Sequence, residues 1–259
     1  MISYQDKTVL ITGASSGIGK AFAETLASKG ANLVLVSRSR DRLNALAADL
    51  RARYKTTADV IAVDLGRGGA PDEVFDQARR MGRDVDVLVN NAGFGAHGSF
   101  HLLPADRLEE MISVNVFALA RLTHLFLPRM IERNNGIIIN VASTAGFQPV
   151  PYMAVYGASK AFVLSFSEAL WAEYRKHGVR VLALCPGATA TDFFKVAGEG
   201  AALGKKRTVD SVVASALRAL DRGRSSVVDG AVNTLATLSV RLSPRGFVAR
   251  AAERIMAPR

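Results

Sequence analysis

Short runs made almost wholly of apolar residues recur along this chain of 259 residues, and each is followed by a turn and a longer helical pattern. They occupy residues 8–11, 32–36, 60–63, 85–89, 137–141, 179–184 and, more briefly, 226–228. A strand with one solvent-exposed face alternates polar and apolar residues, whereas a strand covered on both faces is apolar throughout. The runs therefore predict about seven strands of a parallel sheet with helices on both sides.

The stretches between these runs carry apolar residues at helical spacing, as Ile18, Phe22 and Leu26 illustrate. They cover residues 17–28, 38–53, 72–80, 104–133, 155–176 and 209–221. Strands and helices that alternate in this way predict a three-layer, doubly wound α/β fold, the Rossmann fold, with right-handed crossovers. No change of composition divides the chain, so we expect one domain over residues 1–259.

The single cysteine, Cys185, excludes an internal disulfide. It ends an apolar run just before Pro186, which favours a buried structural thiol over a nucleophile. The sequence does not open with a basic segment followed by an apolar one, and no run approaches the roughly 18 apolar residues of a membrane-spanning helix. We therefore expect a cytoplasmic protein, and no metal site.

Basic residues gather towards the C-terminus. The chain has 33 Lys and Arg against 23 Asp and Glu, a net charge of +10, and residues 204–259 hold 11 of the basic residues and four of the acidic ones. Residues 231–259 form an amphipathic basic extension, whose apolar positions at helical spacing are Phe247, Val248, Ala251, Ala252, Ile255 and Met256. We interpret it as a contact with a second subunit, with docking to a membrane or an acidic partner as the alternative; no nucleic acid is expected.

A glycine-rich turn links the first predicted strand to the first predicted helix. It reads Thr12-Gly13-Ala14-Ser15-Ser16-Gly17-Ile18-Gly19. Gly13 permits the tight turn, while Gly17 and Gly19 let backbone approach a pyrophosphate and let the helix pack on the strand. The free N–H groups of the helix N-terminus then face the phosphates. The turn predicts a dinucleotide site that contains Gly13, Ser15, Ser16, Gly17, Ile18 and Gly19.

The end of the second predicted strand bears on which dinucleotide binds. An acidic residue there would hold the ribose 2′-hydroxyl of NAD, whereas an arginine accommodates the 2′-phosphate of NADP. The sequence reads Val36-Ser37-Arg38-Ser39-Arg40, without a carboxylate. Ser37 and Arg38 therefore predict a preference for NADP(H) over NAD(H). The alternative is that the arginines only begin an exposed helix.

Ser143, Tyr156 and Lys160 form a second constellation. Tyr156 and Lys160 are four residues apart in a predicted helix and so share a face, and Ser143 follows the run 137–141. Reduction of a ketone by hydride produces an alkoxide that must be protonated, and a tyrosine can supply that proton. A nearby ammonium group is expected to lower the tyrosine pKa from about 10, and a serine hydroxyl can polarise the carbonyl.

These motifs together resemble the short-chain dehydrogenase/reductase family. Residues 12–19 match its TGxxxGxG pattern, Asn90-Asn91-Ala92-Gly93 its NNAG signature, and Ser143 with Tyr156-Gly157-Ala158-Ser159-Lys160 its serine and YxxxK. Asn115 fits the active-site asparagine, and Pro186-Gly187 with Thr189 and Thr191 fits the segment near the nicotinamide. The match covers residues from about 7 to 190 with the signatures in order.

The resemblance implies a role for each matching residue. Tyr156 would be the acid–base, Lys160 would hold the nicotinamide ribose and tune the tyrosine, Ser143 would orient the carbonyl, and Asn115 would hold a water in a proton relay. The implied cofactor-binding residues also include Asp64, Leu65, Asn91, Ala92, Gly93, Pro186, Gly187, Thr189 and Thr191. Members of the family are commonly dimers or tetramers, with the helices around Asn115 and Tyr156 at the interface.

The residues expected around the substrate are mostly apolar, which favours a medium-sized apolar ketone, aldehyde or secondary alcohol. They are Phe94, His97, Phe147, Val150, Tyr152, Phe193 and Phe194, together with Ser143. His97 is interpreted as a polar loop residue without a catalytic role. Residues 190–206, rich in Gly, Ala and Lys, are expected to form a mobile loop over the substrate. The alternative functions are an NADP-binding sensor with little turnover and a reductase docked to a membrane by its C-terminal helix.

Overall fold

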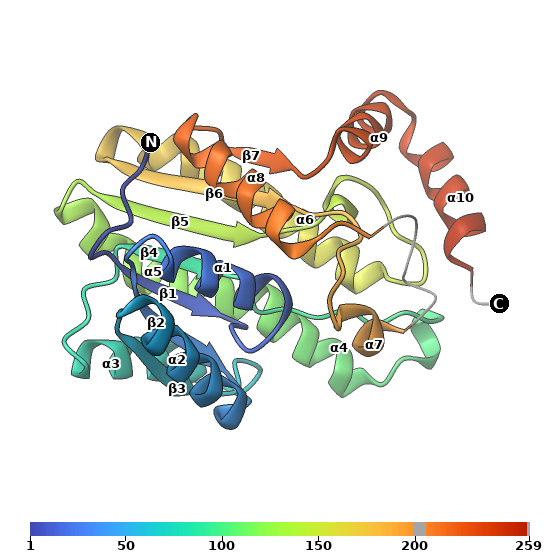
Figure 1. Ribbon diagram of the computed structural model, residues 1–259. Helices are drawn as coiled ribbons and strands as arrows, with labels where there is room; N and C mark the ends of the chain where they lie inside the picture. The colour runs from blue at the N-terminus through green and yellow to red at the C-terminus, as the bar shows by residue number, and fades with distance from the viewer. Residues whose placement is uncertain (199–205, 258–259) are drawn as a thin grey trace.

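The computed structural model describes residues 1–198 and 206–257 (Figure 1). Seven parallel strands form one sheet in the order β3-β2-β1-β4-β5-β6-β7. The strands are β1 (Thr8–Thr12), β2 (Asn32–Ser37), β3 (Ala58–Ala62), β4 (Val87–Asn90), β5 (Gly136–Val141), β6 (Val179–Cys185) and β7 (Ser226–Val228). The predicted doubly wound sheet, including its short seventh strand, is confirmed.

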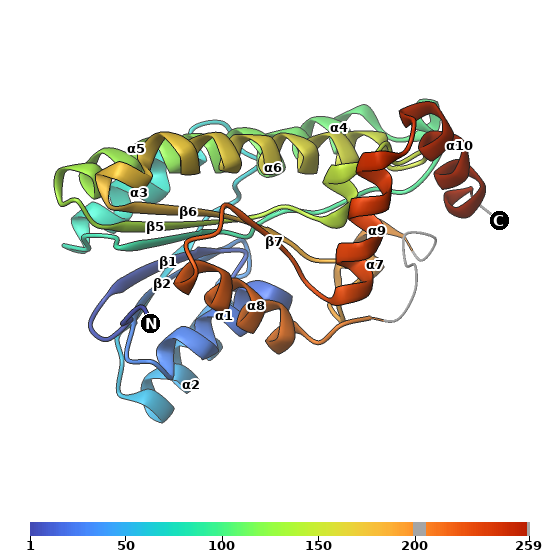
Figure 2. The same ribbon diagram turned by 90° about the horizontal axis from the view of Figure 1, so that it is seen from above.

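Helices cover both faces of the sheet, as the view from above shows (Figure 2). One face carries α1 (Gly17–Ala27), α2 (Arg40–Tyr54) and α8 (Val209–Asp221), and the other carries α3 (Ala70–Arg80), α4 (Ala105–Ile112), α5 (Leu119–Glu132) and α6 (Ala154–Tyr174). The shorter helical turns are η1 (Phe100–Leu102), η3 (Thr144–Phe147), η4 (Arg175–His177) and α7 (Phe193–Ala197). Two C-terminal helices, α9 (Ala231–Leu242) and α10 (Arg245–Met256), lie beyond β7 at one end of the molecule.

The core explains why the predicted runs are apolar throughout. All residues of β1, β4 and β5 are buried, because side chains that alternate along each strand enter one of two large apolar clusters on opposite faces. Cys185 belongs to this interior, and burial raises the pKa of its thiol to about 12. The thiol is therefore protonated at neutral pH, in keeping with a structural cysteine.

The strand order reverses beside β1, and this reversal positions the site. The chain runs from β1 to β2 and β3 on one side, then returns to β4, which pairs with β1 on its other side. Loops that leave β1 and β4 in opposite directions open a crevice at the carboxyl ends of the strands. The glycine turn and the Asn90–Gly93 segment both lie at this crevice.

The helix predicted over residues 104–133 contains one irregular turn. Residues Ser113–Ala118 (η2) form a π-helix between α4 and α5, and Asn115 lies inside it. Such single π-turns within α-helices are frequent at functional sites, because they redirect a side chain from its regular position. The helical stretch Ala105–Glu132 contains an 18-residue window with a mean hydropathy of 1.4, enough to cross a membrane by length and composition alone. It packs against the sheet with its buried side, as a core helix of a globular domain does.

The C-terminal extension differs from the expectation in where its apolar side lies. The helix predicted from residues 247–256 is present as α10, but Val248, Ala252 and Met256 are buried against the same chain. The loop expected over residues 190–206 contains the short helix α7, and its residues 199–205 lie outside the described part of the chain.

Candidate active site

A cavity of about 640 Å³ lies at the carboxyl ends of the strands. One end is formed by the glycine turn and the ends of β2 and β3, and the other by α7, α10 and the segment before α6. Most of the expected cofactor residues line it: Gly13, Ser15, Ser16, Gly17, Ile18, Ser37, Arg38, Asp64, Leu65, Asn91, Ala92, Gly93, Tyr156, Lys160, Pro186, Gly187, Thr189 and Thr191. The structure thus brings together residues from four separate motifs.

Positive φ angles and close contacts in the glycine turn leave no room for side chains at its glycines. Gly13 has a φ of +65° and Gly17 a φ of +54°, a region that favours glycine. A Cβ on Gly17 would lie 3.0 Å from Cγ2 of Thr191, across the mouth of the cavity. A Cβ on Gly19 would lie 2.3 Å from the carbonyl oxygen of Gly13. Gly19 is buried and does not line the cavity, so it serves the close packing of α1 on the turn.

Hydrogen bonds fasten the ends of β1 and β4 to each other. The backbone N–H groups of Asn91 and Ala92 both donate to Oγ1 of Thr12, each at 3.0 Å. The side-chain amide of Asn91 donates to the carbonyl oxygen of Thr12 at 2.9 Å. These bonds hold the two walls of the crevice at a fixed separation. The NNAG segment therefore fixes the position of the glycine turn.

The far end of the cavity, by β2, combines arginines with carboxylates. Nη1 of Arg38 lies 3.0 Å from Oε1 of Glu110 and 3.7 Å from Oδ2 of Asp64, and its side chain is more than half exposed. Arg42, in the first turn of α2, lines the same end. Sequence reasoning did not include Arg42, although its spacing of four from Arg38 in a predicted helix was a usable signal. Two arginines therefore line this end of the cavity, and one of them is paired with carboxylates.

Tyr156 and Lys160 lie on one face of α6, both almost fully buried. Nζ of Lys160 donates to the carbonyl oxygen of Val141 at 2.7 Å and lies 5.9 Å from the centre of the Tyr156 ring. An ammonium group has three donors, so Lys160 retains N–H groups for a ligand in the cavity that it lines. The Ser143 hydroxyl accepts from the backbone N–H of Ala145 at 3.1 Å and hydrogen-bonds with the Tyr156 phenol.

The pKa values differ from the expectation that Lys160 lowers that of Tyr156. Burial raises the pKa of Tyr156, and the hydrogen bond with Ser143 opposes this rise only in part. Burial also lowers the pKa of Lys160 to about 8. Both charged forms lose hydration in the same apolar setting, which explains the two directions. The protein alone therefore holds Tyr156 as a neutral phenol, a proton donor.

Asn115 acts behind the cavity wall. Its side-chain amide donates to the carbonyl oxygen of Phe94 at 2.9 Å and to Oγ of Ser159 at 3.1 Å, and its Oδ1 accepts from the Phe94 N–H at 3.1 Å. Asn115 thus ties the segment after β4 to α6, beside Lys160. A Cβ on Gly93 would lie 2.9 Å from Oδ1 of Asn115 and 3.4 Å from Nζ of Lys160. Gly93 therefore allows both side chains to approach the cavity floor.

The other end of the cavity is apolar. Beside Ser143 and Tyr156, it is lined by side chains from the segment after β4, from the segment before α6, from α7 and from α10. These are Phe94, Val150, Met153, Phe193, Phe194, Ala252, Ile255 and Met256. The α10 residues had been assigned to a subunit contact in the sequence analysis. Their apolar spacing was visible, but the sequence carries no signal that brings residue 256 back over Tyr156.

Three residues expected around the substrate lie elsewhere. Phe147 lies outside the cavity, where the Arg241 guanidinium stacks 5.0 Å from its ring centre. Tyr152 also lies outside it, with a φ of +62° and its carbonyl oxygen bonded to the N–H of Gly98 at 2.9 Å. Nε2 of His97 lies 2.7 Å from the carbonyl oxygen of Met256. His97 thus anchors the end of α10, which agrees with its expected non-catalytic role.

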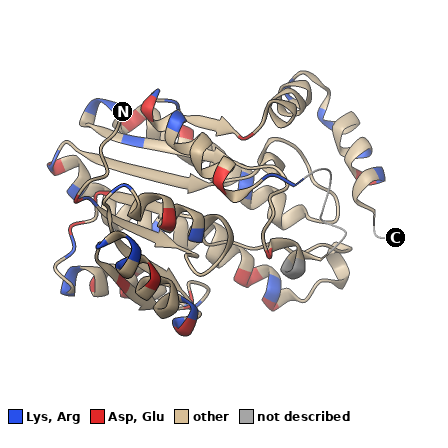
Figure 3. Ribbon diagram, viewed as in Figure 1, with Lys and Arg blue, Asp and Glu red and all other residues tan. Residues whose placement is uncertain are grey.

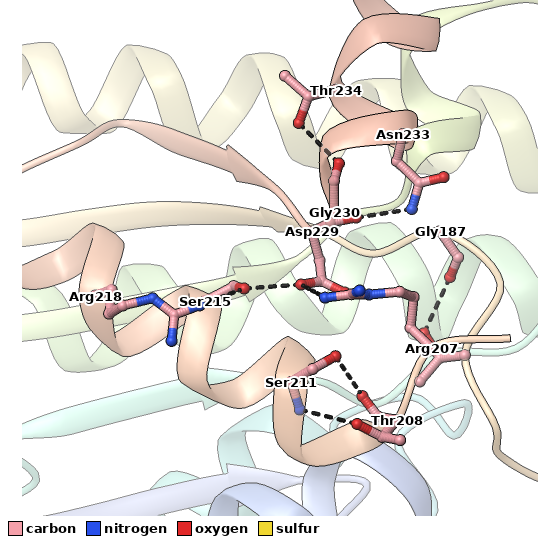
Figure 4. A network of polar contacts seen from close by, with 11 residues as sticks. Gly187, Arg207, Thr208, Ser211, Ser215, Arg218, Asp229, Gly230, Asn233 and Thr234 are labelled. Atoms are coloured by element: carbon pink, nitrogen blue, oxygen red, sulfur yellow. Dashed lines mark hydrogen bonds and ion pairs between the residues drawn. The ribbon is translucent and has the colours of Figure 1, made fainter.

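A polar network beside the cavity joins the segment after β6 to the end of β7 and to α8 (Figure 4). The buried Asp229 receives hydrogen bonds from Nε of Arg207 at 2.8 Å, from Nη2 of Arg207 at 3.2 Å and from the Ser215 hydroxyl at 2.7 Å. The backbone of Arg207 pairs with the segment after β6, donating to the carbonyl of Ala188 and accepting from Ala190, both at 2.8 Å. Asp229 therefore fixes the strand segment that continues from Pro186-Gly187.

The same network reaches the C-terminal helices. The Asn233 side chain, in the first turn of α9, donates to the carbonyl oxygen of Asp229 at 2.7 Å. Asn233 also lines the cavity and packs so closely on Gly187 that a Cβ there would lie 2.4 Å from its Nδ2. Burial favours a raised pKa for Asp229, but the hydrogen bonds from Arg207 and Ser215 outweigh it and lower the pKa. The sequence analysis did not identify Asp229 or Asn233.

Comparison with known proteins identifies the family. Residues 7–202 match the model for short chain dehydrogenases. The chain belongs to the short chain dehydrogenase family. This confirms the resemblance drawn from the motifs, and places the protein among oxidoreductases that interconvert CH–OH and C=O groups.

A very-long-chain 3-oxoacyl-CoA reductase from Mus musculus is 36% identical over 193 residues, which are 72% of this chain and 61% of the mouse protein. The chain therefore spans about three fifths of the length of the curated relatives that it matches. The match to the family model ends at residue 202, before α8, β7, α9 and α10.

Solved relatives cover more of the chain. A short-chain dehydrogenase from Sphingobium yanoikuyae in complex with NADPH has a TM-score of 0.82 at 38% identity and covers 91% of this chain and 94% of its own. The bulky-bulky ketone specific alcohol dehydrogenase from Comamonas testosteroni has a TM-score of 0.79 at 35% identity, covering 91% and 92%. A family member from Burkholderia phymatum in complex with NAD is 28% identical, with a TM-score of 0.82, covering 93% and 94%.

Proposed function

We propose that this protein is an NADP(H)-dependent reductase of medium-sized apolar ketones or aldehydes, acting in reverse on the secondary or primary alcohols. The observation that carries the proposal is the placement of Ser143 and Tyr156. They lie in one cavity between a dinucleotide-shaped end and an apolar end. The glycine turn and Lys160 would hold a nicotinamide dinucleotide there, which would supply the hydride for reduction of the carbonyl.

The protein's own groups would handle the oxygen and its proton. The Ser143 Oγ accepts from Ala145, and its hydroxyl, which meets the Tyr156 phenol in the free protein, would turn to donate to the substrate carbonyl. As the oxygen gains charge, the neutral Tyr156 phenol gives it a proton and becomes a phenolate. Lys160, beside it, would stabilise that phenolate once the cofactor ribose and substrate are in place. Asn115 would keep the Phe94 segment and α6 in register throughout.

The raised pKa of Tyr156 sets the pH dependence expected of the two directions. Reduction needs the phenol, which burial keeps protonated through neutral pH. Oxidation of an alcohol needs the phenolate and should gain as the pH rises. We expect kcat for reduction to be level around neutral pH and to fall in strongly alkaline buffer, with the opposite trend for oxidation, measured on one substrate pair.

The preference for NADP(H) is supported by Arg38 and Arg42 at the β2 end of the cavity. It is tested by the ratio of kcat/KM for NADPH to that for NADH. Arg38→Asp should lower this ratio by roughly 10- to 100-fold, because hydrogen bonds to a charged group contribute about 1.5 to 3 kcal/mol. Arg40→Asp makes the same charge change outside the cavity lining and serves as the control. An unchanged ratio in Arg38→Asp would overturn the assignment.

The substrate class is supported by the apolar lining around Phe193 and Met256. The test is an NADPH-oxidation screen in which ketones of matched reactivity differ in polarity and bulk. We expect turnover to favour apolar aryl or branched alkyl ketones over charged ones. The rival proposal, a cofactor-binding sensor, predicts NADPH binding without turnover of any member of the screen.

A homodimer or homotetramer is also proposed. Ile112, Phe117 and Phe162, on the outward sides of α4, η2 and α6, are apolar and at least 39% exposed. Sedimentation of the purified protein should give a mass above that of the 27.6 kDa chain.

A further inference from the structure

Helix α9 has its apolar side turned to solvent. Its inward side carries Asn233 and Val240, which are half-buried, and Thr237, which is buried with its hydroxyl bonded to the carbonyl of Thr234 at 2.9 Å. Its outward side carries Val232, Leu235, Leu238 and Leu242, which are 82%, 70%, 50% and 89% exposed. These four residues are spaced by three, three and four, so they form one stripe along the helix. A solvent-facing helix of a globular domain ordinarily has the reverse arrangement.

Helix α10 continues this surface with a different composition. Val248, Ala252 and Met256 face inward and are buried, and Met256 reaches the cavity. Phe247 lies on the outward side, 65% exposed, and Arg250 and Arg254 are three and seven residues beyond it on the same side. Figures 1 and 2 show α9 and α10 together forming a projecting corner at the end of the molecule.

Charge distinguishes this corner from an ordinary apolar patch. Residues 231–257 contain four arginines, Arg241, Arg245, Arg250 and Arg254, and a single acidic residue, Glu253. Three of the four arginines are on α10, where Figure 3 shows the basic segments of this corner. Exposed leucines and a phenylalanine beside arginines, with almost no acid, match the composition of helices that lie in the interface of an anionic membrane. A single-sign basic surface also complements anionic lipid headgroups.

We propose that the α9–α10 corner docks on an anionic lipid bilayer surface, with the apolar stripe of α9 inserted in the bilayer and the α10 arginines at the headgroups. A second copy of the chain fits this surface less well. A twofold contact buries the same patch of both subunits, so each copy would bring four arginines and only one acidic residue into the interface. The expected cytoplasmic location is compatible with this surface, since the cytoplasmic leaflet is anionic.

The docked surface and the cavity share a helix. Ala252, Ile255 and Met256 line the apolar end of the cavity from α10, whose other side carries Phe247 and Arg250. A bilayer at the corner would therefore lie one helix away from the substrate end. An apolar ketone concentrated in the bilayer would have a short path to Tyr156. The docking itself does not depend on the proposed reaction, because it is measured without turnover.

The test is flotation of the full chain with vesicles of phosphatidylcholine alone or mixed with phosphatidylglycerol. We expect flotation with the mixed vesicles, weakened by salt. Leu235→Glu/Leu238→Glu should lower the partition coefficient by on the order of tenfold or more, because charge replaces the inserted stripe. Arg250→Gln/Arg254→Gln should lower it about fivefold per charge. Met81→Glu, at the end of α3, removes an exposed apolar residue far from the corner and should change nothing.

Sedimentation of the same variants in the absence of vesicles tests the alternative, that the corner is a subunit interface. If wild type does not float with either vesicle and Leu235→Glu/Leu238→Glu reduces the mass of an oligomer, the corner is a subunit interface and the proposal is wrong. Equal flotation of wild type and both double variants would overturn it as well. A circular dichroism spectrum and the NADPH affinity of each variant establish that it is folded.

Discussion

The two ends of the cavity are built in different ways. At the cofactor end the walls are the carboxyl ends of buried strands, and hydrogen bonds from Asn91 and Ala92 to Thr12 hold them together. At the substrate end the walls are short helices and the C-terminal α10, whose end is anchored by the contact of His97 with the Met256 carbonyl. The first end is built on the buried sheet, whereas the second is built from elements outside the sheet. Cofactor binding and substrate specificity therefore reside in separate parts of the chain, with Ser143 and Tyr156 between them.

Ser143, at the junction of the two ends, should give the largest effect outside the tyrosine itself. Ser143→Ala removes a hydrogen-bond donor to the developing oxyanion and should lower kcat on the order of 10²- to 10³-fold. The Kd of NADPH should stay the same, because the cofactor end is untouched. Thr144→Ala removes the neighbouring hydroxyl, also at the cavity, as a control. Similar losses of kcat in both variants would mean that Ser143 has no special role.

The Arg207–Asp229 pair holds the segment after β6 beside the cavity, and its contribution to stability can be measured. Arg207→Ala leaves a fully buried carboxylate without its partner and should cost about 3 kcal/mol of unfolding free energy. Asp229→Asn should cost about 1 kcal/mol, because the Arg207 side chain is 43% exposed and can be hydrated instead. Denaturant unfolding measures both. Arg83→Ala, which removes the partner of the half-buried Asp59, is the matched pair away from the cavity.

Acid should weaken the stabilisation that the charge of Asp229 gives to the fold. The pKa of Asp229 is lowered in the folded protein, so its charge stabilises the fold above the ordinary carboxyl pKa of about 3.9. That contribution is lost as the pH falls from this value through the lower pKa of the folded state. The stability gap between wild type and Asp229→Asn should therefore narrow in acid. A gap that widens in acid would contradict the ionised state of Asp229.

Met256 gives the smallest expected change, and one confined to the substrate end. Met256→Ala should enlarge the apolar end and shift kcat/KM by roughly tenfold in favour of the bulkier of two ketones. The KM for NADPH should not move. Phe247→Ala, on the outward side of α10, is the control. If Met256→Ala changes the KM for NADPH and leaves ketone selectivity alone, the division of the cavity proposed here is wrong.

The same division explains what the sequence could predict. The sheet and the glycine turn follow from local rules: apolar runs need cover on both faces, and Gly13 and Gly17 need φ above zero. Tyr156 and Lys160 share a face because they are one helical turn apart. The residues concerned are close to one another in sequence, or they follow the ends of parallel strands. Sequence patterns therefore reveal them.

The substrate end could not be predicted because its contacts join distant parts of the chain. Met256 reaches the cavity through the path of α9 and α10, and nothing in its own neighbourhood encodes that path. Phe147 and Tyr152 are aromatic and lie near Tyr156 in sequence. Both nevertheless lie outside the cavity. The pKa of Tyr156 is likewise raised by burial. The four-residue spacing to Lys160 does not reveal how deeply Tyr156 is buried.

The central claim is that Tyr156 protonates the oxygen of the reduced substrate. It is tested most directly by comparing wild type with Tyr156→Phe for NADPH oxidation on the best ketone, with NADPH binding followed by fluorescence. The account predicts that kcat falls by on the order of 10²- to 10⁴-fold, while the Kd of NADPH stays unchanged. Equal turnover by the two proteins would contradict it.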